Sequence, residues 1–304
     1  CDYVEKMVER LRLDDSSRIV EVACNDGTLL RYFHDKGMAC TGIEPTAKSA
    51  AAARALGLNV VGEFLSEKLG KELRSQGHSA DLLVANNVLA HVPEVGDFVA
   101  GCKSLLGNDG VATFEFPHLV ELIANTQMDT IYHEHFSYLS LAAVESIFSA
   151  GGLSVFDVEQ VPTHGGSLRV FAQLASTGTS SPTPGLADIR GLESEAEVGT
   201  VGYYTGFQAR TDRVKNEFLE FLLDARRKGR SVAAYSASAK GNTLLNYAGV
   251  RRDLISFVAD RNPMKQGMFL PGSRIPIVDE AEISRTRPDY VVILSRNLRS
   301  EITN

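Results

Sequence analysis

RIVEVACNDGTLL, residues 18–30, joins an apolar run to a helix-like segment through a short polar turn. The run at 18–24 has the length and the β-branched content of a buried strand, and residues 28–37 have the pattern of a helix that ends at a glycine. Gly27 stands where the two meet, and a glycine there lets the backbone take a positive φ or approach a ligand closely. A strand that turns directly into a helix predicts an α/β fold.

Strand-like and helix-like runs continue to alternate as far as residue 117. The predicted strands are 39–45, 59–64, the first part of 80–92, and 110–117, and a helix is predicted at 46–57. Strands separated by helices predict a parallel sheet with helices on both faces, and ligands of such sheets bind at the carboxyl ends of the strands. Two further runs, 153–161 and 167–175, are joined by PTHGG and predict an antiparallel pair.

A second α/β segment follows a Ser/Thr/Pro/Gly-rich stretch and a long helical pattern. Its strand–loop–helix pattern occupies 231–249, and further strands are predicted at 254–260 and 289–295. We therefore predict three parts. They are a first α/β domain at 1–204, which includes a YHEH segment and the antiparallel pair, a connecting helix at 205–230, and a smaller Rossmann-like α/β domain at 231–304.

The composition excludes several classes of partner. The net charge is −7, and no run of Lys and Arg is interleaved with aromatic residues, which argues against nucleic acid. No apolar stretch is long enough for a membrane span, and the polar N-terminal segment does not have the pattern of a signal peptide. The four cysteines, Cys1, Cys24, Cys40 and Cys102, form no CxxC pair, so we predict neither a structural zinc site nor a disulfide framework, and a reducing cytoplasm fits. We predict no metal site, and we expect the protein to be a monomer.

Polar residues follow four of the predicted strands, where a cofactor would bind. Glu21 is placed to accept a hydrogen bond from a cationic amino group, and Glu44, after the second strand, is placed to hold a ribose diol. Residues 63–64 offer a polar contact and an apolar face for a flat base, and residues 86–87 suit an amino-acid carboxylate or amine. The predicted cofactor-binding residues are Glu21, Asn25, Gly27, Glu44, Glu63, Phe64, Asn86 and Asn87.

The glycine content of the first loop bears on the identity of the cofactor. A dinucleotide would need a GxGxxG loop, whereas Gly27 is the only glycine in this turn. An adenosine cofactor without a pyrophosphate, such as S-adenosylmethionine, fits better. An ordinary strand–helix turn is the alternative.

Six motifs occur in one order along the chain: EVACNDGTLL, GIEPTAKSA, NNVLAHVPE, YHEHFSYLS, THGGSLRV and SASAKGNTLLN. Together they resemble the sugar C-methyltransferases of deoxysugar and antibiotic biosynthesis, from about residue 15 to the C-terminus. The resemblance implies a class I methyltransferase domain, a C-terminal Rossmann-like domain that binds a nucleotide sugar, and methylation at C3 of a dTDP-linked 4-keto deoxysugar by S-adenosylmethionine.

One feature of the resembling family is missing from this sequence. Such enzymes begin with a small cysteine-rich zinc domain that helps to line the substrate site. This chain begins after that point, on Cys1, which we interpret as a remnant of the edge of such a domain. Zinc is therefore expected only with that domain, and full activity of this chain alone stays open.

The segment YHEH, residues 132–135, supplies the side chains that enolate chemistry requires. A C3 proton beside a C4 ketone needs a base that titrates near neutrality, a donor to the enolate oxygen, and a group such as a Glu carboxylate that fixes the tautomer of the base. The resemblance implies that His135 is the base and that Tyr132, Glu134 and His91 line the substrate site, with His133 structural. The alternatives are a metal pair of His133 and His135 on a strand, and a satisfied polar cluster.

The loop at 236–243 resembles an anion cradle, in which backbone N–H groups at the start of a helix meet a phosphate. Lys240 would add a charge for the pyrophosphate, and Asp260 follows at the spacing of a ribose-binding acid. The alternative for this loop is a tight turn with a solvated lysine. The alternative for Arg169 is an ordinary surface position. The predicted substrate-binding residues are Arg169, Ser238, Lys240, Asn242 and Thr243.

Three other functions compete with the sugar C-methyltransferase. An NAD-dependent sugar-nucleotide oxidoreductase or epimerase would use the second α/β domain, but GxGxxG is missing from both domains. A small-molecule O- or N-methyltransferase would share the cofactor site without needing a carbon acid. A noncatalytic subunit that binds a nucleotide sugar would show binding without turnover.

Overall fold

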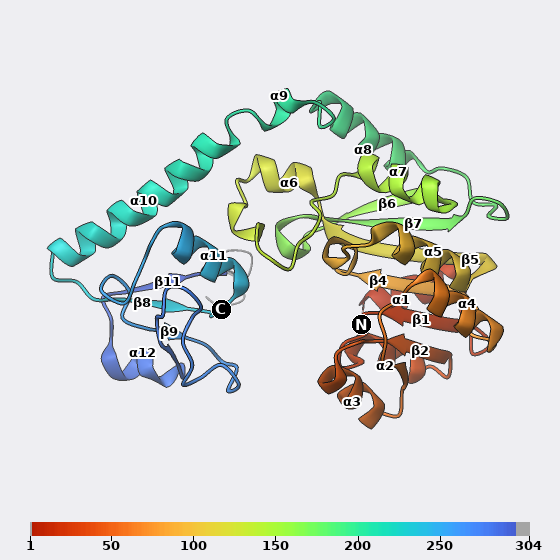
Figure 1. Cartoon of the computed structure of the whole chain (residues 1–304), viewed down its shortest axis with the longest axis horizontal. Coiled ribbons are helices and arrows are strands. Elements are labelled where there is room, and N and C mark those ends of the chain that lie inside the picture. The colour runs from red at the N-terminus through yellow and green to blue at the C-terminus, as the bar shows by residue number, and fades with distance from the viewer. Residues whose placement is uncertain (1, 296–304) are drawn as a thin grey trace. The chain divides into compact units, whose positions relative to one another are not determined.

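The computed structural model of the chain describes residues 2–295. The parallel strands predicted from the first 117 residues belong to one sheet in this structure (Figure 1). The chain divides into two units. Unit 1 comprises Cys1–Val120, Phe136–Pro162 and Gly166–Val198, and unit 2 comprises Glu121–His135, Thr163–Gly165 and Gly199–Asn304.

The sheet of unit 1 has the order β3-β2-β1-β4-β5-β7-β6, and every neighbouring pair is parallel except those made by β7. Its strands are β1 (Arg18–Val22), β2 (Ala39–Ile43), β3 (Asn59–Val61), β4 (Ala80–Asn86), β5 (Leu106–Pro117), β6 (Leu153–Val161) and β7 (Ser167–Leu174). The predicted α/β class and the antiparallel pair β6–β7 are confirmed. The strand order reverses between β1 and β4, so a ligand crevice is expected at the carboxyl ends of these two strands.

Helices cover both faces of this sheet, as predicted. One face is covered by α1 (Asp2–Leu11), α2 (Thr28–His34) and α3 (Ala47–Ala55), and the other by α4 (Glu67–Ser75), α5 (Val95–Leu105), α7 (Leu141–Gly151) and α8 (Pro184–Glu195). Alternate residues of each strand point to opposite faces, so each face has its own apolar core. Ser66 and Ser140 begin α4 and α7 by accepting a backbone N–H with their side chains.

The fourth predicted run, 80–92, is divided by one residue in a left-handed conformation. Strand β4 ends at Asn86, Asn87 has a φ of 54°, and a 3-10 turn, η1 (Leu89–His91), follows. A positive φ cannot continue an extended strand, so the chain turns at the carboxyl edge of the sheet.

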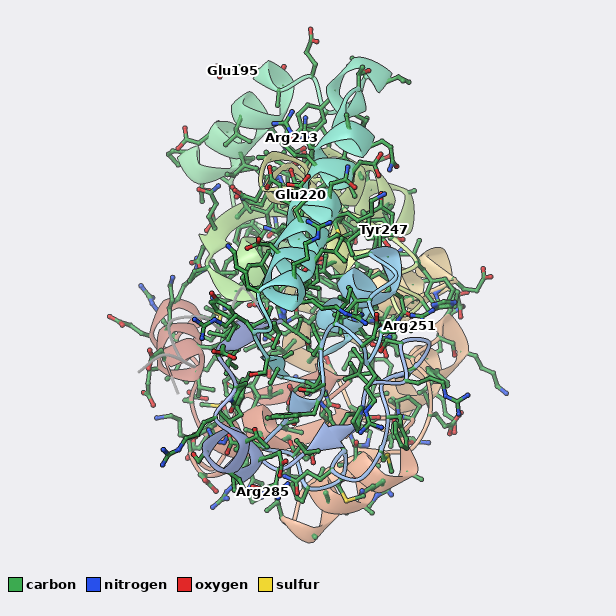
Figure 2. All side chains as sticks on the ribbon, turned by 90° about the vertical axis from the view of Figure 1, so that its left-hand side faces the viewer. Glu195, Arg213, Glu220, Tyr247, Arg251 and Arg285 are labelled. Atoms are coloured by element: carbon green, nitrogen blue, oxygen red, sulfur yellow. The ribbon has the colours of Figure 1, made fainter. Side chains whose placement is uncertain are left out.

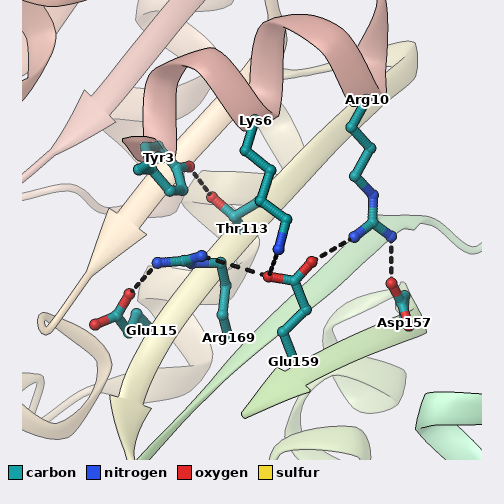
Figure 3. A network of polar contacts seen from close by, with 8 residues as sticks. All are labelled: Tyr3, Lys6, Arg10, Thr113, Glu115, Asp157, Glu159 and Arg169. Atoms are coloured by element: carbon teal, nitrogen blue, oxygen red, sulfur yellow. Dashed lines mark hydrogen bonds and ion pairs between the residues drawn. The ribbon is translucent and has the colours of Figure 1, made fainter. Parts of the chain in front are cut away.

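Helix α1 is fastened to its face of the sheet by a polar network (Figure 3). The network joins this helix to β5, β6 and β7 through the side chains of Tyr3, Lys6, Arg10, Thr113, Glu115, Asp157, Glu159 and Arg169. The Tyr3 hydroxyl and Thr113 Oγ1 lie 2.6 Å apart, and Arg10 pairs with Asp157 and Glu159. Charged groups this close to the core need such partners because an unpaired buried charge is costly.

Unit 2 contains the second predicted α/β fold. Its sheet has the order β10-β9-β8-β11 and is parallel throughout, with β8 (Val232–Tyr235), β9 (Val258–Ala259), β10 (Ile277–Val278) and β11 (Tyr290–Ile293). The helices α11 (Ala239–Tyr247) and α12 (Ala281–Thr286) pack against it. The strand order reverses between β8 and β11, which makes their carboxyl ends the expected crevice.

The long helix α10 (Phe207–Arg227) packs its apolar residues, Leu222 and Ala225 among them, into the core of unit 2. Its opposite side is charged, and Arg213 and Glu220 are exposed there (Figure 2). Tyr247, at the end of α11, donates a hydrogen bond of 2.6 Å to Asp212 of α10. Unit 2 also contains η2 (Met128–Thr130), η3 (Thr163–Gly165), α9 (Val201–Tyr204) and most of α6 (Leu119–Ala124).

The two units divide the chain differently from the predicted domains. The predicted range 1–204 includes the YHEH segment, whereas contacts group residues 121–135 with unit 2. The turn at 163–165 is grouped there as well, and α10 belongs to the same unit as the second sheet. The predicted domain ranges stay a prediction. Among residues 2–295, no helix combines the length and the apolarity that crossing a bilayer requires.

Candidate active site

The loop between β1 and α2 is tightly coiled at the carboxyl edge of unit 1. Ala23, Asn25 and Gly27 have φ values of 56°, 52° and 80°. A Cβ on Gly27 would lie 2.4 Å from Leu58 Cδ1, which is closer than nonbonded carbon atoms approach. Glycine is therefore required at 27 both by its backbone conformation and by the space available.

Three buried acceptors lie at the ends of the adjacent strands β1 and β4. Glu21 Oε2, Asn86 Oδ1 and Asn87 Oδ1 have no hydrogen-bond partner within the described part of the chain. Burial, with a smaller contribution from the charge of Asp26, raises the pKa of Glu21 to about 8. Buried acceptors are normally satisfied, so this group of oxygens suits a ligand that brings hydrogen-bond donors and positive charge.

Glu44 follows β2 and is buried at the same edge of the sheet. Its carboxylate accepts hydrogen bonds from the backbone N–H of Asn25, at 3.1 Å, and of Thr46, at 2.7 Å. A carboxylate has about four acceptor positions, so Glu44 can brace the β1 loop and still accept from a ligand hydroxyl. After β3, Glu63 is exposed and Phe64 is 80% exposed. A phenyl ring so exposed offers an apolar face to a flat ligand.

The YHEH segment forms a turn in unit 2, in which the backbone N–H of His135 donates to the Tyr132 carbonyl at 3.1 Å. His135 Nδ1 lies 2.9 Å from the Thr130 carbonyl oxygen, and the ring of Tyr132 lies 4.4 Å from the imidazole at an interplanar angle of 31°. A carbonyl oxygen only accepts, so Nδ1 carries the proton of this hydrogen bond. In the neutral imidazole the lone pair is therefore on Nε2, as a general base requires.

Two sequence interpretations of this segment need correction. A Glu carboxylate was expected to fix the tautomer of the histidine, but the group on Nδ1 is the backbone carbonyl of Thr130. The metal alternative placed His133 and His135 on a strand, whereas these residues form a turn. Within residues 2–295, no group of three or more His, Cys, Asp or Glu side chains is arranged to hold a metal ion.

The remaining predicted catalytic residues fall in both units. Glu134 is exposed in the same turn as His135, and Tyr132 is half-buried beside the imidazole. His91 belongs to unit 1, where it ends η1 and is half-buried. The roles assigned to these side chains stay predictions.

The loop predicted to be an anion cradle joins β8 to α11. Ser236 has a φ of 75°, and its hydroxyl lies 2.7 Å from that of Ser295, at the point where the strand order reverses. Ser238 begins α11 by accepting the Gly241 backbone N–H at 3.1 Å. A Cβ on Gly241 would lie 2.5 Å from Leu294 Cβ, so glycine lets the helix start close to the end of β11.

Asp260 braces this loop from within the protein. Its carboxylate accepts from the backbone N–H of Ala237 at 2.7 Å and of Asn262 at 2.9 Å. Lys265 lies 3.4 Å from the same carboxylate and donates to the Ala237 carbonyl at 2.9 Å. These contacts give Asp260 a structural role, and the ribose contact suggested by its spacing stays a prediction.

The other polar residues of α11 are also engaged within unit 2. Lys240 Nζ donates to the His164 carbonyl at 3.1 Å, and burial lowers the pKa of Lys240 while the charge of Asp129 opposes that change. Asn242 Oδ1 accepts from the Asn246 side chain at 3.2 Å, and the Thr243 hydroxyl donates to a backbone carbonyl one turn earlier. Ser238, Lys240, Asn242 and Thr243 thus come from one helix start, and their contacts with a substrate stay predictions.

Arg169 is paired with carboxylates of the protein itself (Figure 3). Its guanidinium lies 2.8 Å from Glu115 and 3.4 Å from Glu159, its side chain is 12% exposed, and it stands over the Tyr3 ring at 4.8 Å. The sequence predicted a substrate contact for Arg169. These ion pairs join β7 to β5 and β6, and the substrate contact of Arg169 stays a prediction.

A groove of about 740 Å³ lies elsewhere in unit 1, among α4, α5 and α7. It is lined by residues such as Lys71, Arg74 and Lys103 and extends to Leu106, the first residue of β5. None of the predicted site residues lines it, and the start of β5 is the opposite end of that strand from the candidate cofactor site. The groove is therefore not part of the candidate site.

Comparisons with known proteins give matches along the whole chain. Residues 1–158 match the family model described as a methyltransferase domain, and residues 162–304 match the C-methyltransferase C-terminal domain. The C-methyltransferase NovU of Streptomyces niveus is 35% identical over 299 residues, which are 98% of this chain and 71% of that protein.

Other similarities are more limited. The ubiquinone biosynthesis O-methyltransferase of Rhodopseudomonas palustris (strain TIE-1) is 26% identical over 117 residues, which are 36% of this chain and 44% of that protein. Among solved structures, an S-adenosylmethionine-dependent methyltransferase from Clostridium acetobutylicum ATCC 824 superposes with a TM-score of 0.46 at 12% identity, over 59% of this chain and 90% of that one.

Proposed function

The chain belongs to the family of C-methyltransferases, and on that premise we propose that it transfers a methyl group from S-adenosylmethionine to C3 of a dTDP-linked 4-keto deoxysugar. Unit 1 has the class I methyltransferase fold, which is the fold of S-adenosylmethionine-dependent enzymes. The relative that extends over 98% of the chain is a C-methyltransferase, which supports carbon as the methylated atom.

The carboxyl edge of unit 1 fits S-adenosylmethionine. The unpartnered oxygens of Glu21, Asn86 and Asn87 suit the ammonium group of its amino-acid part, and Glu44 is available for the ribose hydroxyls. Phe64 offers its exposed face to the adenine. When bound, the cofactor supplies an electrophilic methyl group on a sulfonium, which a carbanion takes with the release of S-adenosylhomocysteine.

His135 is the proposed general base. The ketone at C4 makes the C3 proton acidic, and Nε2 of a neutral imidazole accepts that proton while the C3–H bonding electrons become the enolate. The hydrogen bond from Nδ1–H to the Thr130 carbonyl holds the required tautomer and stabilises the imidazolium after proton transfer. This contact is the single structural observation that carries the proposed chemistry.

The nucleotide part of the substrate is assigned to the cradle at the start of α11. Loop residues 236–238 lie where the strand order reverses in unit 2, and the first N–H groups of a helix attract phosphate oxygens. Tyr132 is the proposed donor to the enolate oxygen, since its ring is held against the imidazole.

Substitution of His135 tests this proposal. We expect His135→Asn to bind S-adenosylhomocysteine and dTDP as the wild type does and to lose methylation of a dTDP-4-keto deoxysugar by at least about 100-fold, because general-base catalysis typically supplies that factor or more. His133→Asn, in the same turn but exposed, is the matched control and should retain activity. Methylation is measured by mass spectrometry, and a wild-type rate in His135→Asn would show that His135 is not the base.

A further inference from the structure

Lys240 is the cation that the sequence places in the proposed phosphate cradle, yet its ammonium group contacts another segment of the protein. Lys240 Nζ donates to the His164 carbonyl at 3.1 Å, and Asp129 is near enough to stabilise its charge. Asp129 lies in η2 and His164 in η3, so neither partner belongs to the loop at 236–238. These contacts indicate that Lys240 has a function other than phosphate binding.

The position of His135 depends on a very short element. Its Nδ1–H is held by the carbonyl of Thr130, the last residue of η2, and η2 has only three residues. Two backbone hydrogen bonds, from Thr130 N to Gln127 O and from Ile131 N to Met128 O, hold this turn internally. A turn this short keeps its place through what it packs against, and η2 packs against α11.

The turn at 163–165 connects α11 with the residue that precedes η2. Gln127 Nε2 donates to the Gly165 carbonyl at 2.7 Å, while Lys240 holds the carbonyl of the preceding residue, His164. This turn is conformationally demanding, with a φ of 55° at His164 and 92° at Gly165, so it needs such external support. Lys240 and Gln127 thus hold it from two sides.

We propose that Lys240 is a positioning residue for the base: it fixes η3 and η2 relative to α11 and thereby holds the Thr130 carbonyl on Nδ1 of His135. The chain of contacts runs from Lys240 to the His164 carbonyl, through the turn to Gln127, and through η2 to His135. This inference rests on the proposed role of His135 as the base. It assigns to Lys240 an effect on turnover rather than on nucleotide affinity.

The test separates these two effects in the full chain. In Lys240→Met, we expect the Kd of dTDP, measured by calorimetry, to stay within about twofold of wild type, while exchange of the C3 proton of a dTDP-4-keto deoxysugar in D₂O falls about 100-fold, a typical cost of a small misplacement. Lys240→Arg keeps a cation and a donor and should recover most of the rate. Lys228→Met, at an exposed lysine on the C-terminal side of α10, is the matched control.

The tautomer of His135 gives a readout that does not depend on turnover. Long-range ¹H–¹⁵N spectra of the imidazole, assigned with His135→Asn, should show Nδ1–H in the wild type and a mixture of tautomers in Lys240→Met. Gln127→Leu removes the opposite contact on the 163–165 turn and leaves the cradle untouched, so it should produce the same mixture and serves if Lys240→Met does not fold.

Two results would overturn the inference. One is a dTDP Kd that rises tenfold or more in Lys240→Met with an unchanged His135 tautomer, which would make Lys240 a phosphate ligand. The other is an unchanged tautomer in Gln127→Leu. If the wild type itself exchanges no C3 proton, the proposed function fails, but the tautomer comparison still decides the role of Lys240.

Discussion

Replacement of Glu21 by glutamine tests the electrostatics of the proposed cofactor site. Glu21 is buried at the end of β1, burial raises its pKa to about 8, and its Oε2 has no partner within residues 2–295. The acid is therefore mostly protonated at neutral pH in the free protein. A ligand ammonium group favours the carboxylate, so binding should ionise Glu21 and release a proton.

The magnitude follows from the pKa. With a value of about 8, roughly 1% of Glu21 is ionised at pH 6 and about half at pH 8, so the affinity for S-adenosylhomocysteine should rise about 50-fold over this interval. Glu21→Gln cannot ionise, so its affinity should be nearly constant over the same range and weaker than wild type at pH 8. Glu9→Gln, at an exposed position of α1, is the matched control.

Calorimetric titration of S-adenosylhomocysteine in two buffers of different ionisation enthalpy measures both quantities. At pH 6 to 7 the wild type should release close to one proton on binding, and Glu21→Gln none. The raised pKa also affects stability: the folded protein loses stability from Glu21 as the pH rises from about 4.5 to about 8. The stability of Glu21→Gln relative to wild type should therefore increase over this interval and stay constant above it. A pH-independent affinity in the wild type, or a pH dependence that survives in Glu21→Gln, would refute the reasoning.

Three further substitutions test parts of the structure. Gly27→Ala forces a Cβ into occupied space at a φ of 80° and should cost at least about 1 kcal/mol in denaturant unfolding, with weaker S-adenosylhomocysteine binding; an unchanged midpoint would contradict this. Arg169→Met removes the cation that pairs with buried Glu115 and should cost about 3 kcal/mol, while the Kd of dTDP stays within twofold. A selective loss of dTDP binding would instead support a substrate role for Arg169. Glu193→Ala removes the carboxylate that holds buried His118 at 2.8 Å and begins α7, and should cost about 3 kcal/mol; a loss below about 1 kcal/mol would show that the pair is dispensable.

The architecture was predictable because local sequence patterns indicate its strands and helices. Apolar runs such as 18–24 and 80–86, separated by helical segments, indicate a parallel sheet, and the polar residues after each run mark its carboxyl edge. The structure places Glu21, Glu44 and Asn86 at that edge. What the sequence did not reveal was the left-handed conformation of Asn87, which divides the fourth run.

Contacts between distant residues were not predictable from one sequence. Tyr3 and Thr113 lie 110 positions apart, and nothing in either neighbourhood indicates their hydrogen bond. The same holds for Arg169, whose partners Glu115 and Glu159 come from two other strands. A charged residue on a strand indicates that a partner exists, but not whether the partner belongs to the protein or to a ligand.

The proposed base shows a different kind of limit. The residue types in YHEH indicated proton transfer, and a carboxylate was the expected partner of the histidine because side chains are visible in a sequence. The partner in the structure is the Thr130 carbonyl, a backbone group that every residue has and that no composition signal marks. Gln127 and Lys240 likewise contact backbone carbonyls, those of Gly165 and His164.

The most direct test of the account is to locate the transferred methyl group. The protein is incubated with a dTDP-4-keto deoxysugar and with S-adenosylmethionine carrying a trideuterated methyl group, and the product is characterised by mass spectrometry and ¹³C NMR. The account predicts a trideuteromethyl group bonded to C3 of the sugar, with loss of the C3 proton to solvent. A methyl group on an oxygen or nitrogen atom, or an unmodified sugar from protein that binds both dTDP and S-adenosylhomocysteine, would contradict it.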